Sequence, residues 1–103
     1  MDWENKYSSE TDFAVEEQIK EPPQYRVIFY NDDFTPKDFV VQILVVVFHK
    51  TVTEATELME TVHQKGSALI GVYSWDIANT RVHITVSNAR KNGFPLRCEL
   101  EEE

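Results

Sequence analysis

Three consecutive polar residues, Asn31, Asp32 and Asp33, stand where an apolar stretch typical of a strand gives way to one typical of a helix. Asn and Asp side chains bond readily to nearby backbone. Thr35, just after them, is a good N-cap, and Pro36 suits the first position of a helix. Local turn chemistry therefore explains this corner by itself. A binding site here requires polar groups that converge on the corner from elsewhere in the chain.

His63 supplies such a group if the two helices expected at 36–48 and 51–66 form an antiparallel hairpin. The link between them is short, so the end of the second helix would return to the start of the first. His63 would then lie beside the corner. On its own, this histidine also fits a cation that complements the C-terminal dipole of its helix. The apolar residues expected to line a hole next to it, which also fit a plain core, are Val40, Met59 and Val62.

The chemistry of these groups suits a ligand with a cationic head and an apolar body. Several of these groups can accept hydrogen bonds from an ammonium group: the amide oxygen of Asn31, a carboxylate of Asp32 or Asp33 and a neutral imidazole of His63. The α-amino group of a peptide is such a head. Because the acceptor must be neutral histidine, binding should weaken as the pH falls through the titration range of histidine.

Other functions are less well supported by the sequence. It contains no G-x-S-x-G nucleophile elbow, no H-E-x-x-H or EF-hand spacing and no phosphate-binding glycine loop. We expect no enzyme, no cofactor and no metal. Two alternatives stay open: a metal-assisted hydrolase that uses Asp33 and His63, and an interaction domain whose apolar helix 36–48 docks a partner without any pocket.

The order of elements expected from periodicity and capping signals is β-α-α-β-α-β. Thr35 with Asp38, and more clearly Thr51 with Glu54, resemble capping boxes. Gly71 indicates a bulge or a close backbone approach in the second strand. The expected elements are a strand at 25–30, helices at 36–48 and 51–66, a strand at 67–73, a helix capped by Ser74 that ends before Gly93, and a strand at 96–100.

Composition limits the class of protein. The 103 residues predict one domain at 25–100, with an acidic N-terminal tail at 1–24 and an acidic C-terminal tail at 101–103. A net charge of −8 argues against nucleic acid or an anionic membrane as partner. A single cysteine, Cys98, suits a reducing compartment, and no secretory signal or membrane span is evident. We therefore expect a cytoplasmic protein.

Motifs spread over residues 22–100 resemble the ClpS family, the adaptors of the bacterial Clp protease. These motifs are Pro22-Pro23-x-Tyr25, Asn31-Asp32-Asp33-Phe34-Thr35-Pro36 with Phe39-Val40, Ala55-Thr56-x-Leu58-Met59-x-x-Val62-His63-x-x-Gly66, Gly71-Val72-Tyr73 and Pro95-Leu96-x-Cys98. The resemblance implies an α+β fold, a three-stranded antiparallel sheet with three helices packed on it. It also implies a non-enzymatic adaptor that recognises bulky hydrophobic N-terminal residues (N-degrons) and delivers substrates to an AAA+ Clp unfoldase, ClpA-like or ClpC-like.

The resemblance also assigns roles to residues. Asn31, Asp33 and His63 would hold the substrate α-amino group, and Asp32 would add negative charge. The N-terminal tail would engage the unfoldase. Family members usually carry methionine where this chain has Lys37, which puts the side-chain specificity of the pocket in question. The residues expected to line the hydrophobic pocket are Thr35, Lys37, Val40, Met59, Val62 and Leu96, and those expected to contact the unfoldase are Asp76 and Arg81.

Overall fold

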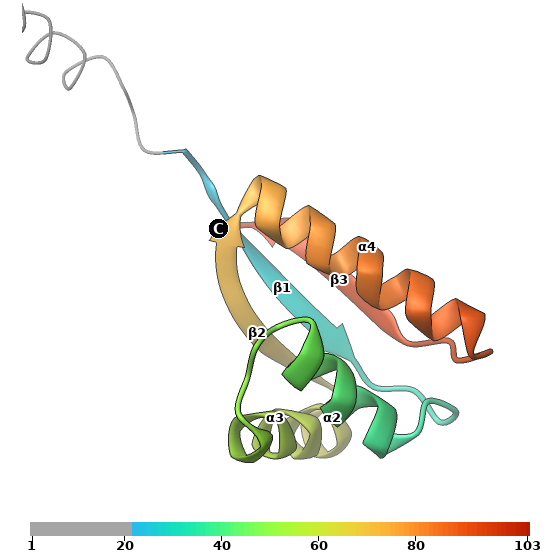
Figure 1. Cartoon of the computed structure of the whole chain (residues 1–103). Coiled ribbons are helices and arrows are strands. Elements are labelled where there is room, and N and C mark those ends of the chain that lie inside the picture. Colours follow the sequence, from blue (N-terminus) through green and yellow to red (C-terminus); the bar gives the residue numbers. More distant parts are fainter. Residues whose placement is uncertain (1–21) are drawn as a thin grey trace, which may run out of the picture.

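The computed structural model, which describes residues 22–103, has the element order that the sequence predicts. Most of the expected N-terminal tail, 1–24, lies outside the described residues. The α+β fold class is confirmed, with three helices and a three-stranded antiparallel sheet (Figure 1). The elements are β1 (Gln24–Tyr30), α2 (Lys37–Val46), α3 (Val52–Lys65), β2 (Ser67–Ser74), α4 (Trp75–Lys91) and β3 (Arg97–Glu102).

Strand β1 lies in the middle of the sheet and pairs antiparallel with both β2 and β3. The register on the β2 side shifts, because Val27 lies opposite Gly71 whereas Ile28 lies opposite Leu69. Ile70 is therefore the extra residue of a bulge beside Gly71, as the sequence predicts. The side chain of Tyr73 lies so close to Gly71 that a Cβ there would be 2.4 Å from the tyrosine hydroxyl.

One face of the sheet carries the core. Val27 and Phe29 of β1 are fully buried, whereas Ile28 between them is only partly so, which is the alternation of a strand with one covered face. The ring of Phe29 meets that of Phe48, just after α2, edge to face at 5.6 Å. This contact fixes the helical hairpin against the central strand.

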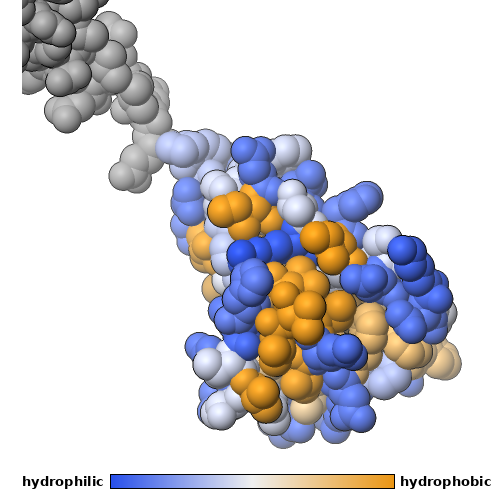
Figure 2. Space-filling model, in the orientation of Figure 1, coloured by the Kyte–Doolittle hydropathy of each residue, from blue (hydrophilic) through white to orange (hydrophobic). Residues whose placement is uncertain are grey.

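Apolar side chains are also visible at the surface between α4 and α2 (Figure 2). Val41 and Val45 of α2 are only partly buried, and Val46 is 64% exposed. The excess of valine that the sequence shows on several sides of this helix therefore extends to the surface. Among the described residues, no helix is long and apolar enough to cross a membrane.

The start of α2 differs from the expectation. The helix begins at Lys37 with Pro36 as its N-cap, and no side chain caps it. The capping box expected for Thr35 and Asp38 is therefore wrong, because Thr35 precedes the N-cap residue. The Thr35 hydroxyl donates instead to the Asp32 carboxylate at 2.8 Å. The capping box of Thr51 and Glu54 is confirmed, with both reciprocal bonds present.

The last strand is longer than expected. Strand β3 runs to Glu102, so the acidic residues expected to form a C-terminal tail at 101–103 begin within the sheet. The carboxylate of Glu101 lies 3.5 Å from the guanidinium of Arg26 in β1, and the backbone N–H of Glu103 donates to the carbonyl of Gln24. The extra pairing exists because Glu101 and Glu102 lie opposite Arg26 and Tyr25 at the start of β1. Strand β1 itself starts one residue earlier than predicted, at Gln24.

Candidate functional site

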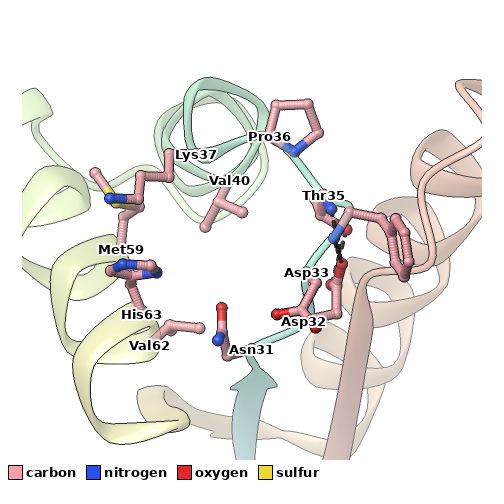
Figure 3. Close-up of a pocket in the computed structure, with 11 residues that line it drawn as sticks. Asn31, Asp32, Asp33, Thr35, Pro36, Lys37, Val40, Met59, Val62 and His63 are labelled. Carbon is pink, nitrogen blue, oxygen red and sulfur yellow. Dashed lines mark hydrogen bonds between the residues drawn. The ribbon is translucent and has the colours of Figure 1, made fainter.

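A cavity of about 360 Å³ opens between the loop after β1 and the hairpin of α2 and α3 (Figure 3). The loop supplies most of its polar groups, and the two helices supply its apolar wall together with Lys37 and His63. Nearly all residues predicted for the site meet here. The lining residues are Asn31, Asp32, Asp33, Phe34, Thr35, Pro36, Lys37, Val40, Met59, Val62 and His63.

The chain brings His63 to the corner through the end of α3. Helix α3 stops at Gly66, which adopts a left-handed conformation with φ 92° that glycine accepts without strain. The backbone N–H of Asn31 then donates to the carbonyl of Gly66 at 2.9 Å. This bond ties the end of β1 to the end of α3. His63, one turn before Gly66, is thereby held next to Asn31.

Asp32 builds the loop. Its Oδ1 accepts the backbone N–H groups of Phe34 at 2.8 Å and Thr35 at 2.7 Å. Its Oδ2 accepts the hydroxyl of Thr35. Both carboxylate oxygens are therefore engaged inside the corner, although Asp32 and Thr35 also line the cavity. The charge of Asp32 is close to any ligand, but its hydrogen-bonding capacity is largely used by the loop.

These bonds lower the pKa of Asp32 below its ordinary value of 3.8. Burial raises the pKa, but the hydrogen bonds from Thr35 and Phe34 outweigh it, and the charge of Arg90 adds to them. A pKa that is lower in the folded state stabilises the protein above the unfolded value, and this stability is lost as the pH falls through the folded value.

The Asp32→Asn variant tests this linkage. It has no titrating carboxylate at this position, so its free energy of unfolding should fall less than that of the wild type between about pH 4 and pH 2. Urea unfolding followed by circular dichroism at each pH measures the difference. Equal losses in the two proteins over that range would contradict the role given to Asp32.

Three acceptor groups stay free. In the part of the chain that the structure describes, the side chains of Asn31, Asp33 and His63 make no hydrogen bond to protein, while Asp32 beside them makes three. Figure 3 shows Asp33 and His63 on opposite sides of the cavity, with Asn31 at the end of β1 between them. An amide oxygen, a carboxylate and an imidazole nitrogen can therefore accept hydrogen bonds from the same group of a ligand.

The apolar side of the cavity comes from the helical hairpin. Val40 of α2 and Met59 and Val62 of α3 are all buried, and each also lines the cavity. Their placement follows from the helical repeat, since residues three apart lie on one face of α3. A bulky apolar group that entered the cavity would meet these side chains.

Leu96 does not line this cavity. It is 1% exposed and belongs to the core, and its carbonyl accepts a bond from Arg90. Phe34 and Pro36 line the cavity although the sequence analysis did not single them out as lining residues. Both lie within the 31–36 corner, so their closeness in sequence to the predicted site residues could have indicated that they line the cavity. The ring of Phe34 is 77% exposed, which no local sequence pattern indicates.

Asp76 and Arg81 lie elsewhere, on α4, where they line a separate shallow cavity with Ile77 and Thr80. The guanidinium of Arg81 stacks over the ring of Tyr73 at 4.9 Å from its centroid. Trp75 and Ile77 beside them are about half exposed. The structure thus gives these two residues a surface of their own, which combines charge with apolar area.

Groups suited to nucleophilic or metal-assisted catalysis include a reactive thiol and a metal-binding cluster. Burial and the nearby charge of Glu99 raise the pKa of the Cys98 thiol to about 12, so it stays protonated near neutral pH. No group of three or more His, Cys, Asp or Glu among residues 22–103 is arranged to hold a metal ion. The groups that line the cavity can accept hydrogen bonds from a cationic head beside an apolar hole.

Fold and site therefore define a small α+β binding domain. The model of the family described as "ATP-dependent Clp protease adaptor protein ClpS" matches residues 20–99. A relative from Nitratidesulfovibrio vulgaris, named ATP-dependent Clp protease adapter protein ClpS, is 45% identical over 90% of this chain and 93% of its own length. One of the same name from Treponema denticola is 43% identical over 96% of this chain and 98% of its own.

A solved structure points the same way. Agrobacterium tumefaciens ClpS2, bound to L-phenylalaninamide, has a TM-score of 0.78 and 36% identity, and the match covers 81% of this chain and all of that one. The chain belongs to the ClpS family of Clp protease adaptors.

Proposed function

We propose that this adaptor binds proteins whose N-terminal residue is bulky and hydrophobic, and that it delivers them to an AAA+ Clp unfoldase. One observation carries the proposal: three acceptor side chains without protein partners in the described chain, Asn31, Asp33 and His63, face a cavity whose other side is apolar. A free α-ammonium group has three N–H donors. Each of the three side chains can accept one hydrogen bond from it, and hydrogen bonds to a charged group are stronger than neutral ones.

The ligand of the Agrobacterium relative supports this assignment. L-Phenylalaninamide has a free α-amino group and a benzyl side chain but no carboxylate, so it resembles the first residue of a peptide. In this chain the ammonium would lie at Asn31, Asp33 and His63. The side chain would enter the hole formed by Val40, Met59 and Val62. The protein acts as an adaptor in the cytoplasm and catalyses no reaction itself.

Contact with the unfoldase is assigned to α4. Asp76 and Arg81 present charges of both signs next to exposed Trp75 and Ile77, which suits a protein surface. Residues 1–24 engage the unfoldase during delivery. The unfoldase is ClpA-like or ClpC-like, and neither nucleic acid nor a membrane is a partner, in keeping with a net charge of −8.

Peptides with a free and an acetylated N-terminus test the α-amino site. A peptide that begins with Leu or Phe should bind at least about tenfold more tightly than its acetylated copy, because acetylation removes the positive charge and two of the donors. Fluorescence anisotropy with a label at the far end of the peptide measures both affinities. A peptide with free N-terminal Ser controls for the apolar hole. Equal affinities for the free and acetylated Leu peptides would exclude the α-amino site and favour a partner-docking module.

A further inference from the structure

Lys37 stands at the mouth of the cavity without a protein partner. It is the first residue of α2, is exposed, and lines the cavity. Figure 3 shows its side chain extending from α2 toward Met59 and His63 of α3. The ion pairs of the described chain are Arg26 with Glu101 and a second pair within β3, so no carboxylate among residues 22–103 neutralises Lys37.

Helix stability does not explain a lysine at this position. The N-terminal end of a helix carries partial positive charge, so a cation in the first turn is unfavourable there and an acidic residue is favoured. Asp38 in the same turn supplies the favourable acidic residue, and helix α2 has no side-chain cap. A residue that breaks a local rule is expected where function requires it. An acidic group on a ligand would give Lys37 the ion-pair partner that it lacks among the described residues.

The proposed substrate brings its second residue to this place. With the α-ammonium held at Asn31, Asp33 and His63 and the first side chain in the apolar hole, the peptide must leave through the mouth of the cavity, where Lys37 lies. The lysine stem can lie along Met59 while its ammonium stays in water. A carboxylate on the second residue would find an unpaired cation there, whereas a basic residue would meet like charge.

We propose that Lys37 makes this pocket select substrates with an acidic second residue after the bulky N-terminal one. The inference rests on the proposed function and names its substrate class. Without Lys37, the surrounding carboxylates of Asp32 and Asp33 and the net charge of −8 favour the opposite order, a basic second residue. Lys37 therefore decides the sign of the preference and not only its size.

Three free-amine peptides that differ only in the second residue test the proposal: Leu-Glu, Leu-Gln and Leu-Lys, each followed by the same neutral sequence. The wild type should bind Leu-Glu about two- to fivefold more tightly than Leu-Lys at low salt, the range of an exposed ion pair. In Lys37→Met the order should vanish or reverse. At about 1 M NaCl the wild-type difference should largely disappear through screening.

Lys50→Met is the matched control. It removes the same charge at the opposite end of the helical hairpin, where Lys50 contributes its backbone N–H to the carbonyl of Leu44, and it should keep the wild-type order. The proposal is overturned if Lys37→Met keeps the order of the wild type, or if the wild type prefers Leu-Lys. Acetylated copies of the three peptides separate the two hypotheses. Loss of free-amine preference would overturn the proposed function, whereas its retention with no effect of the second residue would overturn only the role of Lys37.

Discussion

Replacing Asp33 by alanine is expected to weaken the binding of a peptide with free N-terminal Leu by about 10- to 150-fold. A hydrogen bond to a charged group contributes about 1.5–3 kcal/mol, and every 1.4 kcal/mol is a factor of ten in affinity. The side chain of Asp33 is exposed and makes no hydrogen bond within the described chain, so its loss should change the free energy of unfolding by no more than about 0.5 kcal/mol. Anisotropy and urea unfolding measure the two effects separately.

The neighbouring Asp32→Ala variant is the control for this prediction. It removes the acceptor of three hydrogen bonds inside the loop, so it should lower the free energy of unfolding by about 1–3 kcal/mol. Two adjacent aspartates thus separate binding from stability. Retention of wild-type affinity by Asp33→Ala would show that the α-ammonium is held without this carboxylate. A destabilised Asp33→Ala protein would show instead that Asp33 belongs to the structural part of the loop.

Replacing Phe29 by alanine should have the largest effect on stability. The side chain is 0% exposed, lies in the central strand and packs edge to face against Phe48. Removing a buried phenylalanine leaves a cavity and lowers the free energy of unfolding by about 3–5 kcal/mol. The total free energy of unfolding of native proteins is only about 5–15 kcal/mol. Urea unfolding should therefore show a midpoint far below that of the wild type.

Phe34→Ala is the matched control for Phe29→Ala. The same atoms are removed from a ring that is 77% exposed, and the backbone N–H of Phe34 still donates to Asp32. Its free energy of unfolding should stay within about 0.5 kcal/mol of the wild type. Similar destabilisation by the two variants would contradict the assignment of the core to the helix-covered face of the sheet.

The elements of this fold follow closely from local sequence. The β-branched and aromatic residues before the corner form β1, and the reciprocal pair of Thr51 and Glu54 starts α3 as expected. Gly66 ends that helix in the left-handed conformation. These features were predictable because each depends on the conformational preference of a few neighbouring residues.

The predictions that were wrong concern features that distant or competing contacts determine. Thr35 was expected to accept a backbone N–H of α2, but Pro36 occupies the N-cap position and the Thr35 hydroxyl donates back to Asp32. Leu96 lies in the core just before β3, the strand that packs against α4, and residue spacing does not reveal this burial. The end of β3 depends on where β1 begins, far away in the chain.

The site shows the same division. The sequence by itself determined that Asn31, Asp32 and Asp33 form a polar corner between strand and helix, because turn preferences are local. The residue types alone did not show which aspartate binds the loop and which stays free, although the bonds of Asp32 reach only two and three residues along the chain. Only the tertiary structure decided that His63 faces the corner, because the bond from Asn31 to Gly66 joins two segments far apart in sequence.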